Sequence, residues 1–157
     1  MMPWPYQGDE GHRSHMSTVV PLKPNPAGKR RVLVVEDNLD AVHSMAMLVK
    51  MMGHECMFAI NGFAALQIAR EFKPDVVLLD IGLPDFKGYD IAKQLRWEPG
   101  LEQTRIIAIT ALPEADRQRA LDSGCDEFYR KPLDPRVLEK LLMQPQGSTS
   151  KGAANGP

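Results

Sequence analysis

Short apolar runs alternate with longer segments of helical periodicity through the middle of this 157-residue chain. The first run, residues 32–35, has no polar residue and is rich in Val, which is typical of a strand buried on both faces of a sheet. In residues 38–52 the apolar side chains recur at helical spacing, and Gly53 supplies a C-terminal stop. The same strand-then-helix order occurs five times, which indicates a parallel sheet covered by helices.

The expected elements define an α/β fold. The sequence predicts strands at residues 32–35, 55–59, 76–79, 106–109 and 126–129. It predicts helices at residues 38–52, 88–97, 113–124 and 135–143, and a further helix that Asn61 caps. The first, third and fourth strands are the most apolar and are expected at the centre. This favours a doubly wound five-stranded parallel sheet of order 2-1-3-4-5.

The two ends of the chain lack this alternation. Residues 1–30 hold five of the 13 prolines, so we expect a disordered, basic, Pro-rich tail that is partly derived from cloning around residues 14–16. Residues 145–157 are rich in Gln, Gly, Ser and Ala and are expected to be a second disordered tail. One folded domain, residues 31–144, remains between them.

Charge and composition exclude several classes of protein. Residues 32–143 carry 13 basic and 18 acidic residues, so no basic excess predicts direct DNA binding. No apolar run approaches the ~18 residues of a membrane-spanning helix, and the N-terminus lacks a secretory signal. The two cysteines, Cys56 and Cys125, make neither a disulfide framework nor a metal pair. We therefore expect a cytoplasmic protein that does not associate with membranes.

Polar side chains follow four of the predicted strands, at the edge where such sheets bind ligands. Glu36 and Asp37 follow the first strand, Asp80 the third, Thr110 the fourth and Lys131 the fifth. Three carboxylates brought together repel one another unless a cation lies between them, and oxygen ligands of this kind suit Mg²⁺. A metal ion and an ammonium group would neutralise phosphoryl oxygens while a carboxylate attacks phosphorus. The pattern favours a phosphoryl-accepting site.

Four motifs, in this order, resemble those of bacterial response regulator receiver domains. They are Val34-Val35-Glu36-Asp37-Asn38, Leu78-Leu79-Asp80-Ile81-Gly82-Leu83-Pro84, Ile109-Thr110-Ala111 and Phe128-Tyr129-Arg130-Lys131-Pro132. The resemblance extends over residues 31–143 and implies a flavodoxin-like (βα)5 fold. It also implies a stand-alone receiver that acts in a two-component or phosphorelay system.

The resemblance implies how the acidic residues act. Asp80 accepts the phosphoryl group from a phosphohistidine and is a metal ligand. Asp37 binds Mg²⁺ directly, Glu36 binds it through water, and the backbone carbonyl of Gly82 is a further ligand. Mn²⁺ is expected to substitute for Mg²⁺.

The resemblance also implies a switch. Lys131 and Thr110 each contact a phosphoryl oxygen, and Phe128 is the aromatic side chain that rotates when Thr110 moves. The Lys131–Pro132 peptide bond is often cis in this family. Residues 110–143 then form the face that reports the phosphorylation state to a partner.

Partners follow from the same resemblance. A sensor histidine kinase or a histidine phosphotransfer protein supplies the phosphoryl group, and a downstream protein binds the switched face. A homodimer through the 113–143 face is a further arrangement. The chain is expected to catalyse only its own phosphorylation and dephosphorylation.

Two other interpretations remain open. A receiver cut from a hybrid kinase or a larger regulator would carry the same motifs. An aspartate-nucleophile, Mg²⁺-dependent phosphohydrolase of the haloacid dehalogenase type also places Asp, Thr or Ser, and Lys at strand ends. However, its nucleophile is followed two residues later by a second Asp, where this chain has Gly82.

Two smaller expectations concern the surface. His12, His15, His43 and His54 lack metal-ligand spacing with acids or cysteines and are interpreted as surface residues. Trp97 is interpreted as a half-buried side chain at the end of a helix in preference to an exposed partner contact.

Overall fold

A computed structural model describes residues 28–83 and 88–145 of the chain. The expected tails, residues 1–30 and 145–157, lie for the most part outside the described residues, as do His12, His15 and Pro84. No helix among the described residues is long and apolar enough to cross a membrane.

Five parallel strands form one sheet in the order β2-β1-β3-β4-β5, which confirms the predicted fold class. The strands are β1 (Arg31–Val35), β2 (Glu55–Ala59), β3 (Val76–Leu79), β4 (Arg105–Thr110) and β5 (Glu127–Arg130). β3 and β4 are buried along their whole length, and β1 is buried from its second residue, whereas β2 at the edge is largely exposed. The apolar runs are therefore central, where helices cover both faces of each strand.

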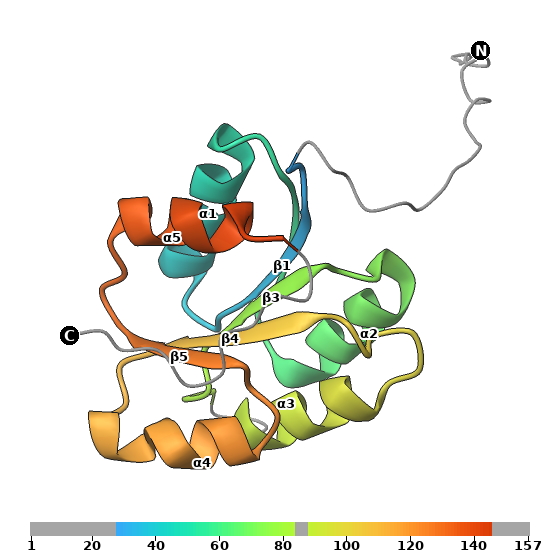
Figure 1. The fold of residues 1–157 in the computed structure, drawn as a ribbon, viewed down its shortest axis with the longest axis vertical. Helices are drawn as coiled ribbons and strands as arrows, with labels where there is room; N and C mark the ends of the chain where they lie inside the picture. The colour runs from blue at the N-terminus through green and yellow to red at the C-terminus, as the bar shows by residue number, and fades with distance from the viewer. Residues whose placement is uncertain (1–27, 84–87, 146–157) are drawn as a thin grey trace.

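Helices cover both faces of the sheet (Figure 1). α1 (Leu39–Met51) and α5 (Pro135–Met143) cover one face, and α2 (Gly62–Phe72), α3 (Gly88–Trp97) and α4 (Arg117–Asp122) cover the other. The buried apolar residues form two clusters, one on each face of the sheet. In β1, Val32 and Val34 belong to the cluster beneath α1 and α5, and Leu33 and Val35 belong to the cluster on the other face. This alternation follows from the two-residue period of a strand.

Polar side chains begin three of the helices, and the caps of the second and last of these were predicted. The side chains of Asn38 and Asn61 each accept the backbone N–H of the residue three positions later, at 2.8 Å. Asp134 accepts the N–H of the residue two positions later at 2.7 Å, and Pro135 follows it as the first residue of α5. Because Asn38 directly follows the acidic pair, this cap fixes where the chain turns from β1 into α1.

The helix predicted at residues 113–124 is shorter and divided. Its first turn is a 3-10 helix, η2 (Glu114–Asp116), and α4 begins only at Arg117. The N–H of Asp116 donates to the carbonyl of Pro113 at 2.9 Å, which is the tighter spacing of a 3-10 turn. Sequence periodicity alone does not distinguish this turn from an α-helical one.

Two surface interpretations are wrong. His54 is buried, with 8% of its surface exposed, and its Nδ1 accepts the backbone N–H of Arg30 at 2.9 Å. Trp97, interpreted as half-buried, is 84% exposed at the last residue of α3. Neither result follows from local sequence, since each depends on how neighbouring elements pack.

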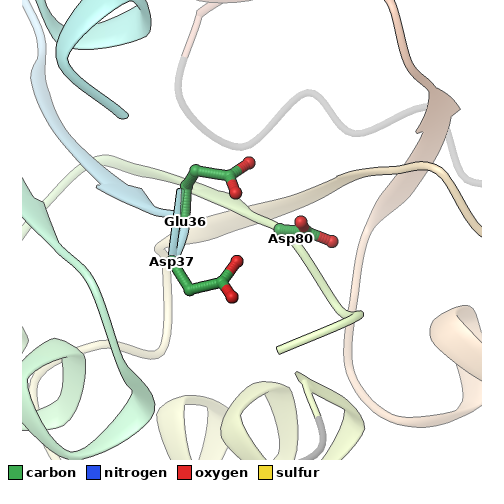
Figure 2. A group of neighbouring side chains, drawn as sticks. All are labelled: Glu36, Asp37 and Asp80. Atoms are coloured by element: carbon green, nitrogen blue, oxygen red, sulfur yellow. The ribbon is translucent and has the colours of Figure 1, made fainter. Parts of the chain in front are cut away.

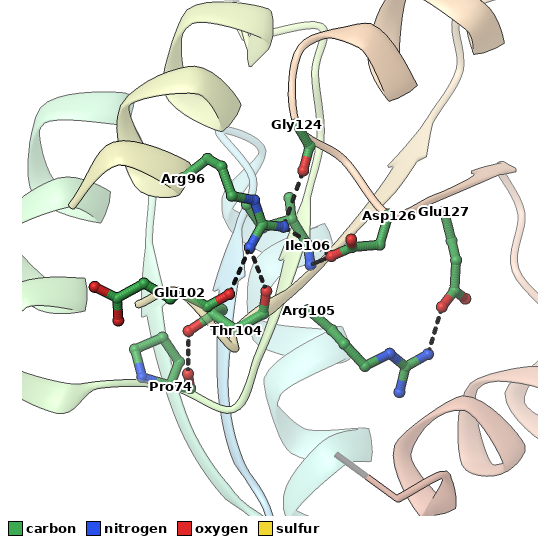
Figure 3. A network of polar contacts seen from close by, with 9 residues as sticks. All are labelled: Pro74, Arg96, Glu102, Thr104, Arg105, Ile106, Gly124, Asp126 and Glu127. Atoms are coloured by element: carbon green, nitrogen blue, oxygen red, sulfur yellow. Dashed lines mark hydrogen bonds and ion pairs between the residues drawn. The ribbon is translucent and has the colours of Figure 1, made fainter. Parts of the chain in front are cut away.

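Arginine side chains link the N-terminal ends of β4 and β5 (Figure 3). Arg96 of α3 donates to the carbonyls of Thr104 and Gly124 at 2.9 and 3.0 Å, and it pairs with Asp126 at 2.8 Å. A second pair, Arg105–Glu127 at 2.6 Å, is almost fully buried and joins the two strands directly. Polar contacts thus join α3, β4 and β5 at the N-terminal ends of the two strands.

Candidate functional site

The three carboxylates predicted to gather at the functional edge do lie together there. Glu36 and Asp37 follow β1, and Asp80 follows β3, the neighbouring strand. One oxygen from each carboxylate lies within 4.8 Å of the other two. Figure 2 shows the three side chains at the ends of these adjacent strands. The strand order accounts for the cluster, because Val35 and Leu79 are register partners and the next residues leave the sheet side by side.

Lys131 lies among these acids. Its Nζ donates to Oε1 of Glu36 at 2.5 Å and to Oδ2 of Asp80 at 3.1 Å. Burial by itself lowers the pKa of Lys131, but the hydrogen bonds to these two carboxylates raise the pKa above its ordinary value. The ammonium group is therefore permanently charged at neutral pH. The Lys131–Pro132 peptide bond is cis.

Gly82 and Thr110 complete the surroundings of Asp80. The backbone N–H of Gly82 donates to Oδ1 of Asp80 at 2.9 Å. A Cβ atom on Gly82 would lie 3.4 Å from that oxygen and 3.7 Å from Oγ1 of Thr110, so the threonine hydroxyl is on the same side. Thr110 is 1% exposed, and its hydroxyl accepts the N–H of Leu112 at 3.2 Å. The hydroxyl at the end of β4 is therefore bonded to the loop that follows the strand.

Phe128 is in β5 and is 1% exposed. Its ring belongs to the apolar cluster beneath α2, α3 and α4. The guanidinium carbon of Arg117 lies 5.1 Å from the ring centre, within the range of a cation–π contact. Phe128 thus connects β5 with the first residue of α4, on the face expected to report the state of the site.

The charge balance fits a hard divalent cation. Three carboxylates and one ammonium group leave the cluster with a net charge of −2. Carboxylate oxygens are the ligands that Mg²⁺ prefers, and it keeps several water molecules in its coordination shell. Asp37 is exposed, whereas Glu36 is buried, so the cluster is open to solvent on the Asp37 side. The donor set therefore suits Mg²⁺ with part of its water retained.

One contact at this site was missed by sequence analysis. The backbone N–H of Asn38 donates to Oε2 of Glu36 at 3.1 Å, while the side chain of Asn38 caps α1. Together with Lys131, this N–H fixes the Glu36 carboxylate from two sides. The only sequence signal was an Asn directly after the acidic pair, which is also a common helix cap.

Comparisons with known proteins agree with this geometry. The family model described as "Response regulator receiver domain" matches residues 32–143. The polar-differentiation response regulator DivK of Brucella anthropi is 34% identical over 114 residues, which cover 71% of this chain and 93% of DivK.

Solved structures have the same fold. The receiver domain of the sensor histidine kinase PA1611 from Pseudomonas aeruginosa is 26% identical with a TM-score of 0.67, and the match covers 73% of this chain and 94% of that domain. That structure contains a magnesium ion coordinated in the active site cleft. The chemotaxis response regulator CheY4 of Vibrio cholerae is 25% identical with a TM-score of 0.68, covering 73% of this chain and 96% of CheY4.

Proposed function

The chain belongs to the response regulator receiver family of two-component signalling, and from this premise we propose that it accepts a phosphoryl group on Asp80. One observation carries the proposal: Asp80 lies between the Lys131 ammonium group at 3.1 Å and the Gly82 N–H at 2.9 Å. Both donors hold the carboxylate, and Lys131 also places a fixed positive charge where phosphoryl oxygens would arrive.

The transfer itself needs few protein groups. A carboxylate oxygen of Asp80 attacks phosphorus in a phosphohistidine, so an O–P bond forms while the N–P bond breaks and the imidazole nitrogen keeps the electron pair. Lys131 and the Thr110 hydroxyl bind two of the phosphoryl oxygens. Mg²⁺, or Mn²⁺ in its place, would be held by Asp37, Asp80, Glu36 through water and the Gly82 carbonyl, and would neutralise phosphoryl charge.

Phosphorylation would then alter the 110–143 face. Thr110 would move from its bond with the Leu112 N–H towards the phosphoryl oxygen, because the acyl phosphate offers a charged acceptor. That motion changes the loop before η2 and the packing of Phe128 against Arg117. The altered face binds the downstream protein target, and a homodimer through residues 113–143 uses the same surface.

The phosphoryl donor is a sensor histidine kinase or a histidine phosphotransfer protein in the cytoplasm. The chain then catalyses only its own phosphorylation and dephosphorylation. Gly82 at the second position after Asp80 argues against a phosphohydrolase of the haloacid dehalogenase type, since glycine cannot act as the general acid. The chemistry would be the same within a hybrid kinase or a larger regulator.

Phosphotransfer from a panel of autophosphorylated histidine kinases tests the proposal. We expect one radiolabel per chain in the presence of Mg²⁺, and none with excess chelator or in Asp80→Asn. Asp90→Asn, which changes an exposed Asp in the first turn of α3, is the matched control and should be labelled normally. Stoichiometric labelling of Asp80→Asn would contradict the assignment of the phosphoacceptor.

A further inference from the structure

A cavity of about 190 Å³ lies beside the acidic cluster, between the sheet and α1. Its body is apolar, and its lining side chains come from β1, α1, β3 and β4: Val34, Ala41, Met45, Leu78 and Ile109. Three of these residues belong to the buried cluster beneath α1 and α5, whereas Ala41 and Met45 are partly exposed. The cavity therefore reaches from the apolar layer to the surface near the start of α1.

The cavity is large enough for a small organic ligand. An apolar protein cavity of about 150 Å³ holds a benzene molecule. On the helix side the cavity is lined by Ala41, which has only a methyl group, and by Met45. A larger side chain at position 41 would occupy much of the cavity.

One end of the cavity is strongly polar. Glu36, Asp80 and Lys131 line that end, and Asp37 belongs to the same carboxylate cluster. These four side chains carry a net charge of −2, so the polar end attracts a cation and repels an anion. Each oxygen of Glu36 and Asp80 already accepts one hydrogen bond from within the protein, so a cationic ligand would share these oxygens as a second donor.

Since the cavity combines an apolar body with an anionic end, we propose that it binds a small primary ammonium ion with an apolar tail. The ammonium group donates hydrogen bonds to the Glu36 and Asp80 carboxylates, and the tail lies between Ala41, Met45 and Ile109. Its charge lies where a metal ion would interact with the same carboxylates, so the ligand and Mg²⁺ exclude each other. Such a ligand would therefore restrain any Mg²⁺-dependent chemistry of the site, which goes beyond the function proposed above.

Benzylammonium chloride is a suitable probe, with toluene and benzoate as neutral and anionic analogues of similar shape. In titrations of the metal-free protein followed by methyl NMR, benzylammonium should shift the signals of Ala41, Met45 and Ile109 in a saturable way. Its dissociation constant should be at least about tenfold lower than that of either analogue. Equal or tighter binding of toluene or benzoate, or shifts confined to other residues, would overturn the inference.

Filling the cavity provides the matched test. Ala41→Leu should weaken benzylammonium binding by about tenfold or more, because the leucine side chain occupies the space of the tail. Ala115→Leu makes the same change at an exposed alanine in η2 and should leave binding unchanged. Equal binding by Ala41→Leu and wild type would place the ligand elsewhere.

Competition with Mg²⁺ in the wild-type protein tests the proposed ligand site even if Ala41→Leu does not fold. Benzylammonium should raise the apparent dissociation constant for Mg²⁺ in proportion to its concentration, as read from the amide signals of residues 36 and 37. An unchanged Mg²⁺ affinity at saturating benzylammonium would contradict the shared site. None of these three experiments depends on phosphorylation, so failure here leaves the assignment of Asp80 untouched.

Discussion

The Nζ atom of Lys131 lies 3.1 Å from Oδ2 of Asp80, although 51 residues separate them in the chain. The same ammonium group bonds Glu36, so it links the ends of β1 and β3 from a position that follows β5. Any group that binds Asp80 therefore competes for, or shares, this ammonium. This relationship couples the chemistry of Asp80 to the loop that leads into α5.

Lys131→Ala should uncouple phosphorylation from the change of the 110–143 face. The variant loses the cation that draws the loop after β5 towards the phosphoryl oxygens, so the phosphorylation-dependent amide shifts in that segment should largely disappear. NMR spectra before and after phosphorylation measure this. Lys140→Ala, an exposed lysine on α5, should behave as wild type. A full set of wild-type shifts in phosphorylated Lys131→Ala would argue against the role of Lys131.

Asp37→Asn should stabilise the metal-free protein by about 1 kcal/mol, because it removes one of three mutually repelling carboxylates. The same change should reduce the stabilisation that added Mg²⁺ provides, since a ligand oxygen loses its charge. Denaturant unfolding with and without Mg²⁺ measures both effects. Asp40→Asn, at an exposed position of α1, is the control. A destabilised Asp37→Asn protein with undiminished Mg²⁺ response would refute the assignment.

Gly88→Ala should destabilise the protein by about 3 kcal/mol, at the upper end for overpacking. A Cβ atom on Gly88 would lie 2.0 Å from the Cα atom of Ile81, so backbone must move. Because Ile81 directly follows Asp80, the movement should also slow phosphotransfer. Gly82→Ala, whose Cβ would meet its nearest neighbour at 3.4 Å, should unfold close to wild type. Equal unfolding midpoints for the two variants would contradict this.

His54 should make stability fall as the pH falls below its ordinary pKa near 6.5. Burial, and then the charge of Arg30, lower the pKa of His54 in the folded protein. The unfolded chain therefore binds a proton at a higher pH than the folded one, and stability decreases between those two pKa values as pH falls. A proton on Nδ1 would also remove the acceptor of the Arg30 N–H.

His54→Asn keeps an acceptor but cannot titrate, so its unfolding free energy should fall less than that of wild type between pH 7.5 and 5.5. Urea unfolding at the two pH values measures the difference. His43→Asn, at an exposed histidine, should show the full wild-type decrease. An identical pH response of His54→Asn and wild type would exclude His54 as the cause.

Local sequence was sufficient for most of the fold. The strands at residues 55–59 and 76–79 and the helix at residues 88–97 have the predicted bounds. Each of these segments carries its own periodicity and end signals. The strand order was predicted since the most apolar runs need two covered faces. The division of the helix predicted at residues 113–124 was not predicted. A 3-10 turn differs from an α-helical turn only in that each N–H bonds the carbonyl three rather than four residues earlier.

The sequence by itself determined which chemical groups stand at the ends of β1, β3, β4 and β5, since strand ends are encoded locally. Only the tertiary structure decided that Lys131 pairs with Glu36, 95 residues away, and that a cavity opens where Ala41 faces three strands. It also buried His54 against Arg30. Such distances and volumes depend on how several elements pack at once, and no local pattern of residues carries that information.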